Sequence, residues 1–236
     1  MRTEHEVNSF QRRTRAEITA KCKCSDSCDC REKAVFLVKL YESCIPHDFW
    51  DLTSKDIKFN VGSYNNVVKK YIKNLNTALR NGYGLLLSGD NGVGKTTFIS
   101  LVLKDALGKG RTAYYTTLPD LLYDISKGFR DKDLSERIEY LLSSDFVAID
   151  EIGKDKTKNR IFAAEFHFER ILKNRFDSAL PTLLASNMSQ KEIKATYGKT
   201  VDSMLRGKYQ TIAMKEGDFR GELRKRMVKA MDYGKI

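Results

Sequence analysis

Short apolar runs alternate with helix-length stretches over the second part of the chain. The runs are GLLLSG at 84–89, TAYYTT at 112–117, DFVAIDE at 145–151, TLLASN at 182–187 and, less regularly, YQTIAMK at 209–215. Unbroken apolar runs of four or five residues between helical segments are typical of parallel strands buried on both faces. The pattern therefore predicts an α/β fold in which βαβ units build a parallel sheet, with the functional site at the carboxyl ends of the strands.

The first sixty residues follow a different pattern. Residues 1–20 are polar and predict a short basic helix or an arm without fixed structure, and after a cysteine cluster the apolar positions of 31–44 favour a helix. Ile45-Pro46 ends that helix, because proline lacks the amide hydrogen that a continuing helix needs. The composition shifts around 57–62, so we expect a small Cys-rich N-terminal module over 1–60 and a larger domain over 61–236.

An amphipathic stretch opens the larger domain. SYNNVVKKYIKNLNTALRNG, at 63–82, places Val67, Tyr71, Leu75 and Leu79 on one face of a helix. The spacing predicts one helix over this stretch.

Composition narrows the class of protein. Hydrophobic residues make up 41% and charged residues 31% of the 236 residues, which supports a real core and excludes a disordered or collagen-like chain. No window approaches the roughly 18 consecutive apolar residues of a membrane span, and the first residues lack the apolar segment of a secretory signal. We expect a soluble cytoplasmic protein without a membrane partner. The net charge of +11 suggests a polyanionic partner, either nucleic acid or an acidic protein.

A phosphate-binding pattern follows the first apolar run. Residues 89–96 read GDNGVGKT and fit G-x-x-x-x-G-K-[ST]. The glycines allow positive φ, so that backbone N–H groups can turn toward phosphate oxygens. Lys95 can place its ammonium against the β- and γ-phosphates, Thr96 can ligate Mg²⁺, and the following helix adds its positive N-terminal dipole. The predicted nucleotide-binding residues are Gly89, Asp90, Asn91, Gly92, Val93, Gly94, Lys95, Thr96 and Thr97.

Polar side chains end two later strands. Asp150 and Glu151 follow Phe146–Ile149, where one carboxylate can hold Mg²⁺ and its neighbour can orient or deprotonate a water molecule. The alternative is a pair that caps the next helix, but two carboxylates favour hydrolysis over binding alone. Asn187 follows Leu183–Ser186 and can hydrogen-bond the γ-phosphate or the water.

In this order and spacing, GDNGVGKTT, FVAIDEIG, NRFDSALPTLLASNMS and EGDFR resemble the DnaC/IstB branch of AAA+ ATPases, over about 40–225. That branch includes bacterial and phage replicative helicase loaders and transposon helper ATPases. The resemblance implies an AAA+ P-loop NTPase core flanked by helices, with ATP and Mg²⁺ as cofactors. It further implies Walker A at Gly89–Thr97, Walker B at Asp150 and Glu151 with Asp150 and Thr96 on Mg²⁺, and sensor 1 at Asn187.

The same resemblance implies roles for two arginines. The sensor 2-like position maps onto Arg220 in the segment GDFR. A trans-acting arginine finger is expected in a Ser-Arg-(Leu/Ile) stretch, but this chain has Ser-Met-Leu at 203–205 and Arg206 just after it. Arg206 is the candidate finger, its alternative being a solvated surface arginine. Lys199 and Lys208 fit less well, because lysine lacks the fork geometry of a guanidinium.

Four cysteines lie within nine residues and can supply a tetrahedral zinc site. They are Cys22, Cys24, Cys28 and Cys30. A mixed set that draws on Cys44, His5 or His47 is an alternative, and so are reduced thiols. Loaders of the branch often carry an N-terminal Cys-rich zinc module, so the resemblance favours a structural Zn²⁺ that shapes a platform for a partner protein.

Basic residues recur after Walker B. They are Lys154, Lys156, Lys158, Arg160, Arg170, Lys173 and Arg175. In the family this region contributes a helix that faces the central channel of the oligomer, so the resemblance implies contacts to single-stranded DNA. Phe162, Phe166 and Phe168 can stack on bases, although their amphipathic helix favours core positions.

Three functions compete. The leading interpretation is an ATP-dependent helicase loader, a homo-oligomer in the ATP state that assembles on single-stranded DNA. In that interpretation the N-terminal module holds a replicative DnaB-type helicase, and hydrolysis releases it. The second is a transposition helper that coats double-stranded DNA and recruits a transposase. The third is a nucleotide-gated DNA-binding adaptor with little hydrolysis, which the altered finger motif suggests. The Cys-rich N-terminus before Ile45-Pro46 favours the loader.

Overall fold

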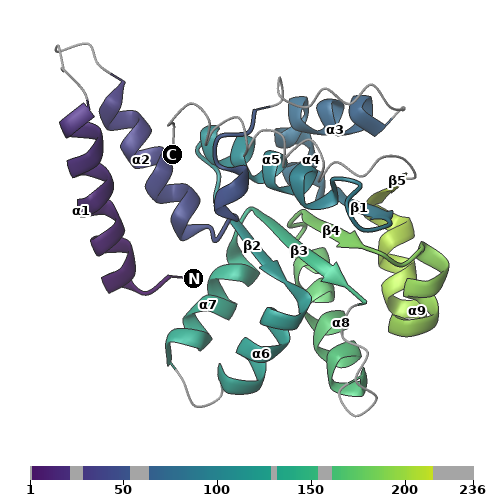
Figure 1. Ribbon diagram of the computed structural model, residues 1–236. Helices are drawn as coiled ribbons and strands as arrows, with labels where there is room; N and C mark the ends of the chain where they lie inside the picture. Colours follow the sequence, from purple (N-terminus) through teal and green to yellow (C-terminus); the bar gives the residue numbers. More distant parts are fainter. Residues whose placement is uncertain (1, 22–28, 54–63, 129–131, 154–160, 215–236) are drawn as a thin grey trace.

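In the computed structural model, which describes residues 2–21, 29–53, 64–128, 132–153 and 161–214, the strands form a parallel sheet between two layers of helices (Figure 1). Within the described chain the sheet has five strands in the order β2-β3-β4-β1-β5, and every neighbouring pair is parallel. The strands are β1 (Gly84–Gly89), β2 (Ala113–Thr117), β3 (Phe146–Ile152), β4 (Thr182–Ser186) and β5 (Tyr209–Met214). All five predicted strands and the parallel α/β fold are confirmed.

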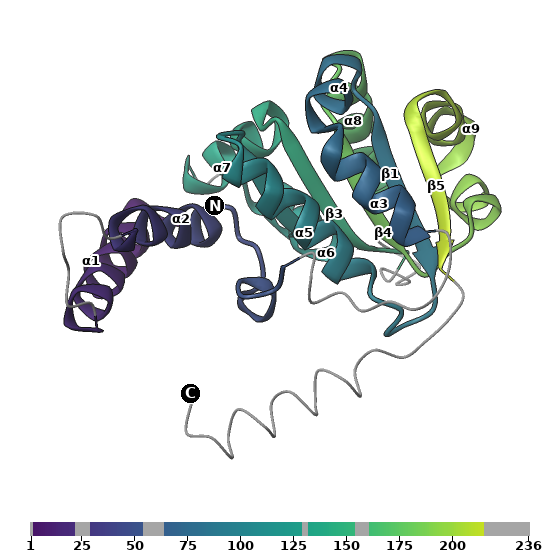
Figure 2. The same ribbon diagram turned by 90° about the horizontal axis from the view of Figure 1, so that it is seen from above.

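The helices cover both faces of this sheet. They are α1 (Glu4–Lys21), α2 (Cys30–Glu42), the 3₁₀ turn η1 (His47–Phe49), α3 (Tyr64–Lys73), α4 (Leu75–Asn81), α5 (Lys95–Gly108), α6 (Leu118–Gly128), α7 (Lys132–Ser143), α8 (Ile161–Asp177) and α9 (Gln190–Lys208). Helices α2 to α5 share one buried cluster with the sheet, and α6 to α9 share another with its opposite face. Helices α1 and α2 lie side by side (Figure 2), beyond the edge of the sheet that β2 forms (Figure 1).

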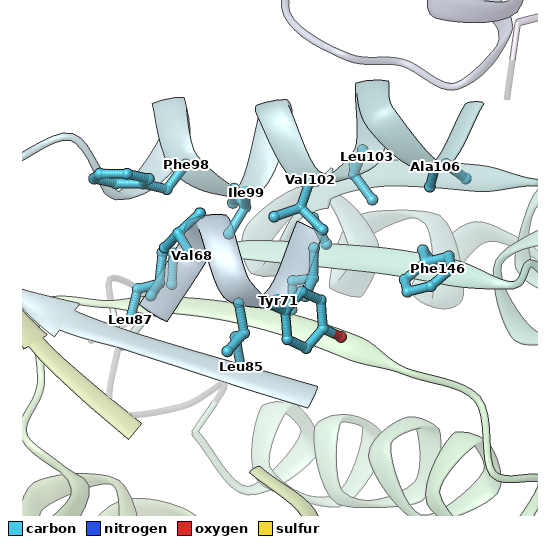
Figure 3. Packing of buried hydrophobic residues seen from close by; sticks show 14 of the residues in the cluster. Val68, Tyr71, Leu85, Leu87, Phe98, Ile99, Val102, Leu103, Ala106 and Phe146 are labelled. Carbon is cyan, nitrogen blue, oxygen red and sulfur yellow. The ribbon is translucent and has the colours of Figure 1, made fainter. Parts of the chain in front are cut away.

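Helix α5 is the most deeply buried helix of the first layer. Ile99, Val102, Leu103 and Ala106 are fully buried. Figure 3 shows them on the side of α5 that faces Val68 and Tyr71 of α3 and Phe146 of the sheet. Because α5 has neighbours on both sides, it is apolar around most of its circumference rather than along one stripe. This packing fixes its first residue, Lys95, at the carboxyl end of β1.

The amphipathic stretch at 63–82 is not a single helix, so that prediction is wrong. The structure divides it at Asn74, whose backbone is non-helical and whose side-chain Nδ2 donates to the carbonyl oxygen of Lys70 at 2.7 Å. The backbone N–H of Asn74 still donates to the carbonyl oxygens of Lys70 and Tyr71, at 3.1 and 3.0 Å, so the helix ends only at this residue. Tyr71 and Leu75 are nevertheless buried, as the predicted apolar face requires.

The N-terminal residues form a helical hairpin. Of the two predictions for 1–20 the helix is confirmed, and Thr3 and Glu6 cap it reciprocally: the Glu6 N–H donates to Thr3 Oγ1 at 3.2 Å, and the Thr3 N–H donates to Glu6 Oε2 at 2.7 Å. The predicted second helix is confirmed as α2. The ring of Phe10 stacks on that of Tyr41 with centroids 4.2 Å apart, which joins the two helices.

The chain that leaves α2 is attached to the rest of the fold. The backbone N–H of Tyr115 in β2 donates to the carbonyl oxygen of Ser43 at 2.9 Å. Lys104 of α5 donates to the carbonyl oxygens of Phe49, Trp50 and Leu52, just after η1. Residues 54–63 lie outside the described residues, so the boundary between 1–60 and 61–236 stays a prediction.

Arg175 is a structural residue, which corrects its assignment to the DNA-binding set. Its side chain is 0% exposed, so it cannot reach a phosphate. The guanidinium donates to the carbonyl oxygens of Leu141, Ser144 and Pro181 at 2.7, 2.9 and 2.8 Å, and to Thr182 Oγ1 at 3.0 Å. It thus ties the end of α7 to the start of β4. Burial lowers the pKa of Arg175 to about 10.

The replacement Arg175→Leu should lower the free energy of unfolding by at least about 3 kcal/mol, because it leaves several buried carbonyl groups without a donor. The matched control is Arg170→Leu, an exposed arginine on the same helix, which should change it by less than about 0.5 kcal/mol. Urea denaturation followed by circular dichroism measures both values. Equal effects of the two replacements would contradict the structural role of Arg175.

Candidate nucleotide-binding site

The predicted site residues of three strands meet at one edge of the sheet. Residues 90–94 follow β1, which ends at Gly89. Asp150 and Glu151 lie in the last part of β3, and Asn187 follows β4. The strands are parallel and adjacent in the order β3-β4-β1, so their carboxyl ends share this edge. The order and direction of the strands therefore bring these three segments to one place.

The loop after β1 has the backbone of a phosphate cradle. Gly92 and Gly94 have φ of 88° and 90°, in the left-handed region that L side chains rarely adopt. Gly94 is the N-cap of α5, and the loop therefore delivers its N–H groups and the positive end of the helix dipole to one place. This geometry suits a phosphate group.

Lys95 is buried at the start of α5 and is held by oxygen atoms. Its Nζ donates to the carbonyl oxygens of Gly89 and Asp90 at 2.7 and 2.8 Å, and to Oδ1 of Asn187 at 2.8 Å. These contacts keep the ammonium over the loop rather than in solvent. An entering phosphate therefore competes with neutral oxygens, which bind an ammonium less strongly than an anion does.

Asn187 links the loop to the strand beside it. Its Oδ1 accepts from Lys95, and its Nδ2 donates to Oδ1 of Asn91 at 2.9 Å. One side-chain amide thus contacts two residues of the predicted phosphate-binding loop. The contact with Asn91 was not expected from the sequence, because a residue ninety-six positions away gives no local signal.

Asp150 and Thr96 form an oxygen pair that suits Mg²⁺. Thr96 Oγ1 donates to Asp150 Oδ2 at 2.6 Å, and Asp150 is buried. Mg²⁺ prefers a few carboxylate or hydroxyl oxygens and completes its shell with water and phosphate oxygens. The donor set therefore fits the predicted ion.

Glu151 sits in a bulge of β3. The pairing of β3 with β4 shifts register between Ile149 and Ile152, and Glu151 has φ of 59°. A left-handed conformation costs a non-glycine residue on the order of 1 kcal/mol or more, and bulges often re-aim a side chain next to an active site. The Glu151 N–H donates to Asp150 Oδ1 at 2.7 Å, which holds the first carboxylate in place.

Tyr115 is a site residue that the sequence analysis missed. Its hydroxyl donates to Asp150 Oδ2 at 3.1 Å from the neighbouring strand β2. Burial raises the pKa of Tyr115, and the nearby carboxylates of Asp150 and Glu151 raise it further, so the hydroxyl keeps its proton. The sequence shows Tyr115 only as one residue of a strand, since the order of the strands cannot be deduced from their apolar pattern.

Neither predicted arginine is among the residues that the structure describes at this site. Arg206 is near the end of α9, which leads into the amino end of β5, whereas the phosphate loop follows the carboxyl end of β1. Its side chain is 67% exposed and pairs with Asp202, with 3.1 Å between Nε and Oδ2. A role for Arg206 in its own chain's site does not fit this placement, so the trans role stays a prediction. Arg220 lies outside the described residues.

The predicted zinc ligands are only partly described. Cys30 is the first residue of α2 and is half-buried, while Cys22, Cys24 and Cys28 lie outside the described residues. Among the residues that the structure does describe, there is no group of three or more His, Cys, Asp or Glu side chains placed to hold a metal ion. The zinc site stays a prediction.

Only some residues of the predicted DNA-binding region are described in the structure. Residues 154–160, with Lys154, Lys156, Lys158 and Arg160, lie outside the described part, and so does the side chain of Phe162. Arg170 and Lys173 are exposed on α8. The core position is confirmed for Phe168 and wrong for Phe166, which is 57% exposed because the buried face of α8 runs through Phe168, Ile171 and Leu172.

No helix within the described ranges is both long enough and apolar enough to cross a membrane.

Comparison with known proteins places the chain in a family. The model of the family described as "IstB-like ATP binding protein" matches residues 43–206. The replicative helicase loader DnaI of Bacillus subtilis (strain 168) is 24% identical over 127 residues, which are 54% of this chain and 40% of that protein. The chromosomal replication initiator protein DnaA of Aliarcobacter butzleri (strain RM4018) is 25% identical over 138 residues, 56% of this chain and 32% of that protein. The chain thus spans less than half the length of both curated relatives.

Solved structures agree on the fold. The crystal structure of the DnaC helicase loader matches with a TM-score of 0.63 at 20% identity, over 72% of this chain and 100% of that one. The replication initiator DnaA bound to AMPPCP and single-stranded DNA matches with a TM-score of 0.60 at 18% identity, over 80% and 57%. These likenesses show the AAA+ fold. Because the family model covers well over half of the 236 residues, this chain belongs to the family of IstB-like ATP binding proteins.

Proposed function

We propose that this protein is an ATP-dependent replicative helicase loader. It binds ATP with Mg²⁺, assembles as a homo-oligomer on single-stranded DNA, and delivers a DnaB-type helicase that ATP hydrolysis releases. The observation that carries the ATPase part is the pair of contacts Lys95–Asn187 and Thr96–Asp150, which joins the phosphate loop to β4 and β3. The loader part is supported by DnaI, a relative named as a replicative helicase loader.

Each residue has a task in this proposal. Thr96 and Asp150 would hold Mg²⁺, which when bound neutralises charge on the phosphates. Lys95 leaves its oxygen partners for the β- and γ-phosphates. Glu151 orients the attacking water and accepts its proton, and Asn187, next to Lys95, hydrogen-bonds the γ-phosphate or the water.

The DNA and oligomer parts rest on charge and placement. The net charge of +11 favours a polyanionic partner, and exposed Arg170, Lys173 and Phe166 lie on one helix, α8. Arg206 is exposed near the end of α9. It is the proposed arginine finger, which would enter the nucleotide site of a neighbouring copy. Arg220 is the proposed sensor 2 residue.

The α1–α2 hairpin is the proposed contact for the helicase. In this proposal zinc on Cys22, Cys24, Cys28 and Cys30 organises the hairpin. A cytoplasmic location follows from this function.

The transposition helper is the second candidate. The observation that favours it is the family model itself, which is named for IstB-like proteins. It uses the same ATPase core, so the partner and not the site separates it from the loader. The third candidate, a nucleotide-gated DNA-binding adaptor with little hydrolysis, rests on the departure of residues 203–205 from the family's finger motif.

Asn187→Ala should slow ATP turnover by roughly 10²-fold, the usual cost of losing one positioned hydrogen-bonding group. ATP affinity should stay the same or rise, because Lys95 loses a competing oxygen partner. Turnover assays and equilibrium binding measure the two effects, with exposed Asn174→Ala on α8 as the matched control. Reduced affinity together with unchanged turnover would contradict the role given to Asn187.

Glu151→Gln should keep ATP binding and slow hydrolysis by roughly 10² to 10⁴, the usual contribution of a general base. Lys95→Ala is the companion variant, and it should lose ATP binding while the fold stays intact. Phosphate release and fluorescent-nucleotide binding check both variants. If Glu151→Gln hydrolyses ATP at the parental rate, Glu151 is only a structural residue of the β3 bulge.

If the parent protein itself scarcely hydrolyses ATP, with or without single-stranded DNA, the adaptor function replaces the loader.

Affinity capture separates the loader from the transposition helper. The immobilised Glu151→Gln protein with ATP should retain a purified DnaB-type helicase, because it stays in the ATP-bound assembly. The Lys95→Ala protein should retain much less. Retention of a transposase and not of the helicase would overturn the loader and favour the second candidate.

A further inference from the structure

Tyr115 lies on the same face of the sheet as the predicted Mg²⁺ ligand. In the register of β2 with β3, Tyr115 pairs with Ala148, two residues before Asp150. Side chains two apart on a strand share a face, so Tyr115 and Asp150 are diagonal neighbours. The long phenol side chain closes this gap, and its hydroxyl donates to Asp150 Oδ2 at 3.1 Å.

Both oxygens of Asp150 are held by donors. Oδ1 accepts from the backbone N–H of Glu151 at 2.7 Å, and Oδ2 accepts from the Tyr115 hydroxyl and from Thr96 Oγ1. When Thr96 turns its oxygen to a metal ion, the other two donors still fix the carboxylate. A held carboxylate matters for Mg²⁺, which demands near-ideal octahedral geometry.

Tyr115 is itself anchored at its backbone. Its N–H donates to the carbonyl oxygen of Ser43 at 2.9 Å, and its ring packs against the buried cluster around α5. The hydroxyl therefore presents its proton from a fixed position. Groups that orient metal ligands in this way commonly change metal affinity by about 10- to 100-fold when they are removed.

We infer that Tyr115 is a positioning residue that orients the Asp150 carboxylate for the Mg²⁺ of bound nucleotide. The inference rests on the proposed function, because it assumes that this site takes a magnesium nucleotide. Tyr115 acts through Asp150 and does not touch the reacting atoms. Removal of its hydroxyl weakens the affinity of the site for Mg²⁺ without weakening the hold of Lys95 on the phosphates.

The test compares Tyr115→Phe with Tyr114→Phe. Each replacement removes one phenolic oxygen from β2, but Tyr114 faces the opposite layer, where its ring meets that of Tyr140 at 5.9 Å. Magnesium is titrated into the full-length protein with a fluorescent ATP analogue, and the same affinity is measured in EDTA. Tyr115→Phe should raise the half-saturating Mg²⁺ concentration by roughly 10-fold and leave the EDTA affinity unchanged. Tyr114→Phe should change neither.

Each other outcome has a definite meaning. A parental Mg²⁺ response in Tyr115→Phe overturns the inference and leaves the proposed function in place. An equal shift in Tyr114→Phe, or a parallel loss of EDTA affinity in Tyr115→Phe, shows a general effect on the strand and also overturns it. If the parent protein binds no nucleotide at any Mg²⁺ concentration, the proposed function fails and the inference fails with it.

Discussion

The burial of α5 between the sheet and the N-terminal helices is the constraint on which the site depends. It contacts strands β1 to β4 of the sheet and the neighbouring helices α2 and α3, which fixes the axis and the starting point of the helix. Lys95 and Thr96 are the first two residues of that helix. Their positions relative to Asp150 and Asn187 are therefore set by core packing and not only by the loop before them. A cavity in this core would displace the site even though no site residue had changed.

The sequence predicts the chemical groups of the site better than it predicts the contacts between residues on different strands. All five strands and the segments that meet at their carboxyl ends follow from apolar runs and from the polar residues that end them. Those signals are local, since the central strands β1, β3 and β4 are buried on both faces and each motif is continuous in the chain. The order of the strands is a long-range property, so the contact between Tyr115 and Asp150 has no counterpart in the sequence pattern.

The corrections have the same origin. Arg175 resembles its charged neighbours in the sequence, yet α8 turns it toward the carbonyl groups at the end of α7, and only tertiary structure shows this. Phe166 has the hydrophobicity of a core residue but lies away from the buried face of its helix. At Asn74 the backbone leaves the helical conformation, although the apolar spacing continues across the break. Residue type alone therefore does not decide whether a side chain is buried or whether a helix continues.

The hydrogen bond between Ser43 and Tyr115 has a thermodynamic consequence. Ser43 follows α2 directly, and Tyr115 contacts the carboxylate that would hold the metal ion. A ligand that binds the α1–α2 hairpin and displaces Ser43 would remove a hydrogen bond from the residue that contacts Asp150. By linkage, the change in the ligand's affinity caused by magnesium nucleotide equals the change in nucleotide affinity caused by the ligand. Any coupling that runs through this backbone contact is therefore reciprocal, although neither ligand touches the other.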